Sequence, residues 1–275
     1  MARVDEIALY FNGHELIGDT FSHDEIEQWF EQEVEGYFGL YGNAEERKAY
    51  GNHALNAHYL FKHLPDGDFP VVMGLGSGNG DEFEPIAARC GKITIVDPSD
   101  GHSDTVRWGV DIAYEKAVNS GVLGFEDDTF DLIVCFSCLH HIPNVSFVVS
   151  ELFRVLKPGG TILIREPIIS MGDWRAPRLG LTRNERGLPL LLFQNMMDRA
   201  GFTTRSLKVC SFPLLERLKP FFTGGVYNNR AVVLLDDLLS RLTLVNYRYH
   251  ATSVWHKFRP VAVSIVAMKS AAKKG

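Results

Sequence analysis

The chain has 275 residues, of which 45% are hydrophobic, so it is long enough to bury one full α/β core and to add a cap or lid. One elaborated domain is therefore favoured over two equal domains. The formal net charge of −6 provides no basic field, which argues against a nucleic-acid partner held through its phosphates. A small uncharged or cationic molecule is the better partner. The oligomeric state is not indicated.

The beginning of the chain, MARVDEIALYFNG, lacks the basic start and apolar run of a signal peptide. No stretch of about 18 apolar residues follows anywhere, so no integral membrane segment is expected. These features predict a soluble, cytoplasmic protein.

Four cysteines are spread along the chain, and no second Cys pair or His cluster stands at metal-ligand spacing. We therefore expect no metal site. Cys135 and Cys138 form a CxxC pair inside the apolar run DLIVCFSCL, which favours reduced thiols packed in a core over a redox or zinc role.

Two helices are predicted at the start of the chain. Ser22 and Glu25 have the spacing of a capping box, and apolar residues then recur at helical intervals from Ile26 to Phe38. A second helix is expected over residues 44–63, before the turn signal Pro-Asp-Gly-Asp at 65–68. Residues 1–66 therefore form a predicted N-terminal helical cap.

Strands and helices alternate after this cap. The strands are expected at residues 70–75, 92–96, 112–118, 131–137 and 161–165, and the helices through 87–88 and over 145–156. A polar loop (167–187), a helix (189–200), a strand (203–210), an insertion (211–260) containing an amphipathic helix, and a last strand (261–268) complete the chain. This alternation predicts a doubly wound α/β sheet.

Gly76, Gly78 and Gly80 occupy alternate positions between the first strand and its helix, where the backbone approaches a ligand closely. The dinucleotide fingerprint needs a glycine at 79 or 81, but Asn79 and Asp81 stand there, and no Gly-Lys-Ser/Thr follows. The loop therefore predicts a nucleotide-type cofactor, and argues against both NAD and a P-loop.

Asp97 ends the second strand. Its carboxylate can accept hydrogen bonds from both hydroxyls of a ribose. Alternatively, it caps the next turn together with Pro98 and Ser99. Spacing alone leaves both interpretations open.

Four successive segments, VVMGLGSGNG, TIVDPS, GFEDDTFDLIVCFSCLHHIPN and RVLKPGGTILIREP, closely resemble the motifs of class I S-adenosylmethionine-dependent methyltransferases. The resemblance runs from about Val71 to Pro167. It implies a Rossmann-like seven-stranded sheet of order 3-2-1-4-5-7-6 with an antiparallel last strand, an S-adenosylmethionine-binding domain over 67–275, and a helical lid between the last two strands. The subgroup of ubiquinone, lipopolysaccharide and sugar methyltransferases is the most similar.

The resemblance implies S-adenosylmethionine as cofactor, S-adenosylhomocysteine as its product, and a set of binding positions. These positions are Gly74, Leu75, Gly76, Ser77, Gly78, Asn79, Asp97, Pro98, Val118, Asn119, Ser137 and Cys138. The sequence departs from the family pattern in two places. Gly74 stands where an acidic residue is usual, and the stretch between Asp97 and the third strand is short enough to reduce or remove a helix.

His140 and His141 follow the fourth strand at the carboxyl edge of the sheet, and Glu166 ends the fifth strand at the same edge. A histidine here can take the proton of a hydroxyl acceptor, and Glu166 can orient the histidine or receive the proton itself. The same arrangement also resembles sugar O-methyltransferases. The alternative is a structural HHIP turn in which an imidazole satisfies backbone groups.

The loop after the fifth strand combines an aromatic residue with many polar donors, as a sugar or phosphate-bearing acceptor would require. The acceptor contacts expected here and from the N-terminal helix are Trp174, Arg175, Arg183, Arg186 and Tyr41. This loop resembles one in methyltransferases of surface-polysaccharide pathways. A solvated loop with internal ion pairs is the alternative.

Together these features predict methyl transfer to a hydroxyl of a small acceptor, a saccharide or other hydroxylated metabolite. Three alternatives remain: N- or C-methylation of a small metabolite, cofactor binding without catalysis, and a nicotinamide-dependent oxidoreductase.

Overall fold

The computed structural model describes residues 4–41, 50–99 and 105–271, and the side chains of 4–7 and 34–41 lie outside the described part. Eight strands form one sheet: β1 (Phe69–Leu75), β2 (Cys90–Asp97), β3 (Val106–Arg107), β4 (Val110–Lys116), β5 (Phe130–Phe136), β6 (Leu156–Pro167), β7 (Phe202–Cys210) and β8 (Ala262–Lys269). Their order is β3-β4-β2-β1-β5-β6-β8-β7. The predicted α/β class is confirmed.

The predicted seven-stranded sheet was wrong in its strand count. The extra strand β3 pairs antiparallel with β4 and forms a two-residue edge. It stands in the short connection between β2 and β4, where residues 105–109 contain β3 and a turn instead of a crossover helix. Without β3, the remaining strands follow the predicted succession, and β8 runs antiparallel to both β6 and β7.

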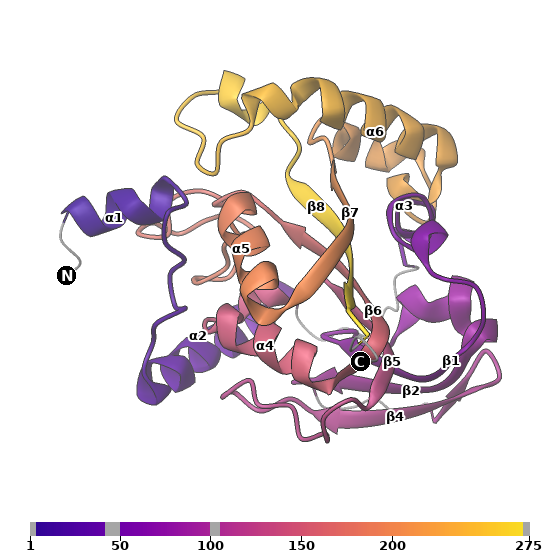
Figure 1. Cartoon of the computed structure of the whole chain (residues 1–275). Coiled ribbons are helices and arrows are strands. Elements are labelled where there is room, and N and C mark those ends of the chain that lie inside the picture. The colour runs from indigo at the N-terminus through magenta and orange to yellow at the C-terminus, as the bar shows by residue number, and fades with distance from the viewer. Residues whose placement is uncertain (1–3, 42–49, 100–104, 272–275) are drawn as a thin grey trace.

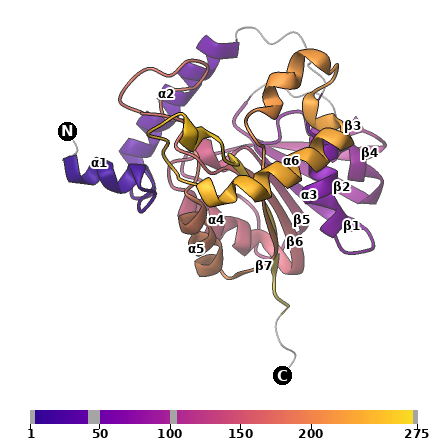
Figure 2. The same cartoon turned by 90° about the horizontal axis from the view of Figure 1, so that it is seen from above.

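The helices cover both faces of this sheet. They are α1 (Val4–Phe11), α2 (His23–Tyr41), α3 (His53–Tyr59), α4 (Val145–Val155), α5 (Leu190–Ala200) and α6 (Arg230–Thr243). Short 3-10 helices are η1 (Phe61–His63), η2 (Asp81–Arg89), η3 (Leu139–His141), η4 (Leu215–Phe221), η5 (Val226–Asn228), η6 (Leu244–Asn246) and η7 (Trp255–Lys257). Figures 1 and 2 show α4 and α5 on one face and α3 and α6 on the other, and each face has its own core cluster.

The glutamate half of the predicted capping box is present at the start of α2. The Glu25 carboxylate accepts hydrogen bonds from the backbone N–H and the hydroxyl of Ser22, both at 2.8 Å. The expected helix after the glycine loop is instead the 3-10 helix η2, which contains Pro85. Proline removes one backbone donor and clashes with the preceding turn of an α-helix, so this segment does not form regular α-helix.

The insertion between β7 and β8 packs against the rest of the domain through a buried aspartate. Asp236 on α6 accepts hydrogen bonds from the backbone of Ser211 and Phe212 and from the hydroxyls of Tyr59 and Tyr227. The predicted amphipathic helix is present, but part of its apolar stripe faces outward: Leu235, Leu238 and Leu242 are exposed. Among the described residues, no helix combines the length and apolar character needed to cross a bilayer.

Candidate cofactor pocket and histidine cluster

The glycine loop follows β1 and turns through left-handed backbone. Gly76, Gly78 and Gly80 have φ values of +64°, +49° and +72°. A Cβ on Gly76 would overlap the Sγ of Cys138, whereas a Cβ on Gly78 would meet open space within 4 Å. The loop therefore needs glycine for its conformation, and at Gly78 it leaves a cradle beside the backbone, where a ligand can approach.

Gly74 leaves no room for a side chain. A Cβ there would meet the Ser77 side chain and lie 2.8 Å from the Phe83 ring. The usual acidic residue therefore does not fit this loop, because Ser77 already fills its place. The carboxyl group of Glu82 on η2, buried beside Ser77, lies in the same pocket instead.

Asp97 performs the capping role that was one of its two predicted roles. Its Oδ1 accepts hydrogen bonds from the backbone N–H and hydroxyl of Ser99, and its Oδ2 accepts the N–H of Gly78 at 2.8 Å. A carboxylate offers about four lone-pair sites. These contacts tie the ribose candidate to the glycine loop, and ribose binding stays a hypothesis.

The residues expected around an adenine lie at the same edge of the sheet. Pro98 and Val118 are exposed, so their apolar surfaces are open to a ring. Asn119 donates its amide N–H to Glu27 of α2 at 2.6 Å. The N-terminal helix therefore reaches this end of the expected site.

A cavity of about 240 Å³ opens between the glycine loop and the ends of β5 and β6. Its lining includes Gly76 and Ser77, which are predicted cofactor positions. The following lining residues were not predicted: Tyr50, Asn52, Asp81, Glu82, Phe136 and Arg165. Ser137, also in the lining, has φ +56°, a conformation that costs a non-glycine residue free energy and occurs most often at functional sites.

A buried carboxyl group, Glu82, and a buried guanidinium group, Arg165, line the cavity. Burial raises the pKa of Glu82 to about 7, against the opposing effects of the Ser77 hydroxyl and Arg165. The Arg165 guanidinium donates to the Asn56 amide oxygen at 2.5 Å and lies over the Phe136 ring. Sequence reasoning missed both residues, because Glu82 stood in an expected surface helix and Arg165 inside an apolar strand.

Glu166 organises the histidine turn. Its Oε1 accepts the backbone N–H groups of Cys138 and Leu139 at 2.8 and 2.9 Å, and its Oε2 lies 2.8 Å from Nδ1 of His140. The carboxylate is fully buried. The structural role of the HHIP turn and the predicted orienting role of Glu166 are therefore compatible.

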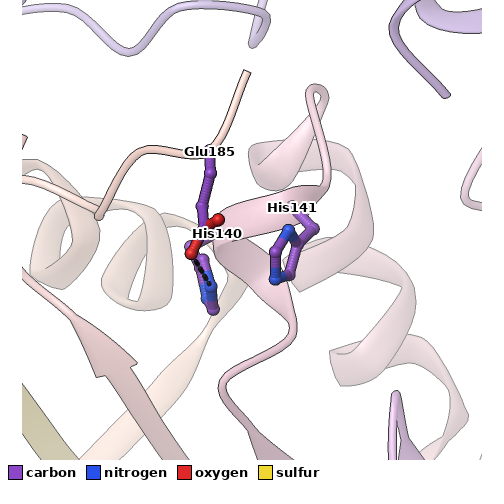
Figure 3. Close-up of side chains that lie close together, drawn as sticks. All are labelled: His140, His141 and Glu185. Atoms are coloured by element: carbon purple, nitrogen blue, oxygen red, sulfur yellow. Dashed lines mark ion pairs between the residues drawn. The ribbon is translucent and has the colours of Figure 1, made fainter. Parts of the chain in front are cut away.

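His140 lies between two carboxylates. Its Nε2 is 3.7 Å from Oε1 of Glu185 (Figure 3), whereas its Nδ1 faces Glu166. Burial lowers the pKa of His140, but hydrogen bonds to Glu166 and Glu185 outweigh it and raise the pKa to about 9. Glu185 was not among the predicted site residues, because nothing in a polar loop distinguishes it from its charged neighbours.

His141 is held by the N-terminal helix α2. Its Nδ1 lies 3.1 Å from Oε2 of Glu33, and the Trp29 indole N–H donates to its carbonyl at 2.8 Å. Glu33 also accepts hydrogen bonds from Thr182 and from the backbone of Asn184. The structure thus brings α2 and the polar loop together around the two histidines, whose ring centroids are 4.0 Å apart.

The expected acceptor contacts do not gather at one place. Trp174 stacks on Phe11 of α1 at 4.6 Å, and Arg175 pairs with Asp173 and lies over the same ring. Arg183 is exposed. Tyr41 ends α2, and its side chain lies outside the described residues.

Arg186 is fully buried and serves the backbone. Its guanidinium donates to the carbonyls of Ile17, His140, Ile142 and Pro143. Burial lowers its pKa to about 10. Because these donors are engaged with main-chain oxygens, Arg186 fixes the histidine turn in position and is not directed at a ligand.

Part of the chain is similar to known methyltransferases. Residues 73–164 match the family described as a methyltransferase domain. The ubiquinone/menaquinone biosynthesis C-methyltransferase UbiE of Hydrogenovibrio crunogenus is 28% identical over 152 residues, 49% of this chain and 58% of that protein. The ubiquinone biosynthesis O-methyltransferase of Pseudomonas entomophila is 27% identical over 96 residues, 33% of this chain and 41% of that protein. The chain thus spans about half the length of these curated relatives.

Solved structures share the fold at low identity. The Haemonchus contortus Phospholethanolamine N-methyltransferase 2, in complex with phosphomonomethylethanolamine and S-adenosylhomocysteine, has a TM-score of 0.51 at 18% identity, over 86% of this chain and 57% of that chain. The [4+2]-cyclase SpnF has a TM-score of 0.50 at 15% identity, over 94% and 100%. The domain match and the shared fold together support a class I methyltransferase.

Proposed function

We propose that this chain is an S-adenosylmethionine-dependent methyltransferase that methylates a hydroxyl of a small acceptor. The observation that carries the proposal is the cavity at the carboxyl edge of the sheet, between the glycine loop and Ser137. Open α/β sheets bind their ligands at this edge. The fold alone does not decide the activity, since the same fold occurs in a protein named as a cyclase.

The residues of the cavity and of the sheet edge beside it fit the cofactor. The open space beside Gly78 would take its backbone-facing portion, and Asp97 would bind the ribose hydroxyls. Glu82 and Arg165 supply a carboxyl and a guanidinium in one cavity, a combination suited to the ammonium and carboxylate of an amino-acid tail. Pro98 and Val118 would contact the adenine. When bound, the sulfonium cofactor supplies an activated methyl group.

The acceptor end adjoins this cavity. The histidine turn begins directly after Ser137 and Cys138, so an acceptor approaching the methyl group would meet His140 and His141. A hydroxyl must lose its proton as the new C–O bond forms, and a positioned acid–base group typically contributes about 10² to 10⁴ in rate. Glu166 accepts three backbone N–H groups and faces Nδ1 of His140, so it acts as the positioning residue. His140 keeps its own proton below about pH 9, so the proton of the acceptor leaves through His141.

C-methylation is the second candidate, because the first relatives named above include both a C- and an O-methyltransferase of quinone biosynthesis. A carbon acceptor also loses a proton, so the histidine pair serves either reaction. The acceptor panel must therefore contain phenols and quinol analogues beside glycosides and nucleotide sugars.

The test begins with calorimetric titration of the purified protein with S-adenosylmethionine, S-adenosylhomocysteine and NADH. We expect heat with the first two and none with NADH. Methyl transfer from labelled cofactor to the acceptor panel follows, with the methylated atom identified by NMR. Absence of heat with both sulfur compounds would refute the proposal. Binding without transfer to any acceptor would favour a noncatalytic protein of the same fold.

A further inference from the structure

Two histidines and a glutamate converge at the site in a way that general acid–base chemistry does not require. Ligand atoms of His140, His141 and Glu185 all lie within 4.8 Å of one another (Figure 3). They come from separate segments, the turn after β5 and the loop after β6. None of them lines the cofactor cavity, so the cluster is a separate centre beside it.

Each imidazole is oriented by its own carboxylate. Nδ1 of His140 lies 2.8 Å from Glu166, and Nδ1 of His141 lies 3.1 Å from Glu33. Nε2 of each ring is then the nitrogen available to a cation. Histidines that bind metals almost always donate their second ring N–H to a carboxylate, carbonyl or water, which fixes the tautomer and ring orientation. Both histidines of this pair have such a carboxylate partner. These partners are a second observation that favours a metal site, separate from the short distances between the ligand atoms.

The third group completes a two-histidine, one-carboxylate set. Oε1 of Glu185 is 3.7 Å from Nε2 of His140. Two donors bound to one ion at about 2.0–2.2 Å lie roughly 3.0–3.4 Å apart, so the three donor atoms, which all lie within 4.8 Å of one another, close the set by moving inward together. Glu185 is half-buried on a loop, where such a movement is accessible.

The charges around the cluster also suit a cation. Three carboxylates, Glu33, Glu166 and Glu185, surround the two imidazoles. The neighbouring guanidinium groups of Arg178 and Arg186 donate to main-chain carbonyls. The three carboxylates thus outnumber the two guanidinium groups, whose N–H groups already donate to main-chain carbonyls.

We propose that His140, His141 and Glu185 bind one divalent transition-metal ion, with Glu166 and Glu33 as positioning residues. Imidazole nitrogens with one carboxylate favour Zn²⁺, Co²⁺ or Fe²⁺ over Mg²⁺ and Ca²⁺, which prefer oxygen ligands alone. Three protein ligands leave coordination positions for water or for an oxygen atom of the acceptor. With the ion bound, the imidazoles would act as ligands, and a coordinated hydroxide would take the proton of the acceptor in their place. Sequence analysis predicted no metal site, and Glu185 and Glu33 lie too far from the histidines along the chain to form a recognisable ligand spacing.

The test uses the full chain without an affinity tag, stripped with chelator and titrated with Co²⁺. Visible absorption reports the ligand field of bound Co²⁺ and gives the affinity for Co²⁺. Competition with Zn²⁺ then gives the affinity for Zn²⁺. We expect one ion per chain. His141→Ala and Glu185→Gln change residues that are only partly buried, so both variants should fold, which circular dichroism checks. Each should weaken Co²⁺ binding at least tenfold. Glu33→Gln, which removes an orienting carboxylate, should weaken it about 10- to 100-fold.

His256→Ala is the matched control, since this histidine is partly buried like His141 and its ring has a hydrogen-bond contact only with Thr252 among the described residues. It should bind Co²⁺ as the wild type does. Failure of the wild-type chain to bind one equivalent of Co²⁺ would overturn the proposal, as would binding by His141→Ala and Glu185→Gln within threefold of wild type. Titration of the same samples with S-adenosylhomocysteine tests the proposed function separately.

Discussion

Replacing Glu82 by glutamine tests the buried carboxyl of the cofactor cavity. Glutamine has nearly the shape of the protonated acid and cannot ionise. Burial raises the pKa of Glu82 from 4.5 to about 7. Because each pKa unit corresponds to about 1.4 kcal/mol, ionising this group in the folded protein costs up to about 3 kcal/mol relative to the unfolded chain.

The direction of the pH effect follows from proton binding. Between pH 4.5 and 7 the folded protein retains the proton of Glu82 more readily than the unfolded chain does. The contribution of this carboxyl to stability is therefore fully present below pH 4.5 and is lost as the pH rises through 7. We expect wild type and Glu82→Gln to have similar free energies of unfolding near pH 5, and the variant to be the more stable by up to about 3 kcal/mol at pH 8.

Urea unfolding followed by circular dichroism at pH 5 and pH 8 measures both values. Glu126→Gln is the control, because Glu126 is exposed and its substitution should leave the wild-type pH dependence intact. A difference between wild type and Glu82→Gln that is the same at both pH values would refute the reasoning. In that case the pKa of Glu82 in the fold would not be raised above that of the unfolded chain, and the carboxyl would be ionised in the fold at both pH values.

Three further substitutions test the loop, the insertion and the histidine turn. Gly78→Ala places a methyl group in the open space beside the loop, at a left-handed φ. Titration should therefore show at least tenfold weaker binding of S-adenosylhomocysteine. Gly124 also borders open space but has an ordinary φ, so Gly124→Ala should bind S-adenosylhomocysteine as the wild type does. Asp236→Ala leaves two backbone N–H groups and two tyrosine hydroxyls without their acceptor. It should lower the free energy of unfolding in urea by about 2–4 kcal/mol. The control Asp237→Ala should lower it by about 1 kcal/mol or less. Arg186→Met deprives four carbonyls of their donor and should cost about 3–5 kcal/mol by the same assay; a loss under 1 kcal/mol would show that water replaces the guanidinium.

Local signals predicted the parts of the fold that depend on neighbouring residues. The glutamate half of the Ser22–Glu25 capping box, the glycine turn after β1 and the succession of the longer strands follow from spacing and periodicity, and the structure contains them. The edge strand β3 was missed because two residues carry no periodicity. The α-helix expected after the glycine loop was wrong because one proline outweighs a favourable apolar pattern.

The candidate site was harder to predict where it depends on distant contacts. The histidine turn and Glu166 could be placed from the order of the strands, since the carboxyl ends of parallel strands share an edge. Glu33 reaches His141 from a helix more than one hundred positions earlier. Arg186 was expected at an acceptor because its charge suggested exposure, whereas its burial is possible only because four carbonyls converge on it.

Helix α2 holds one of the two histidines of the site in position. It supplies the carboxylate of Glu33 to His141 and the indole N–H of Trp29 to the same residue's carbonyl. An incoming molecule that pushed this helix aside would release the ring of His141 at the same moment. Entry of a reactant past α2 and the orientation of the His141 ring are therefore coupled.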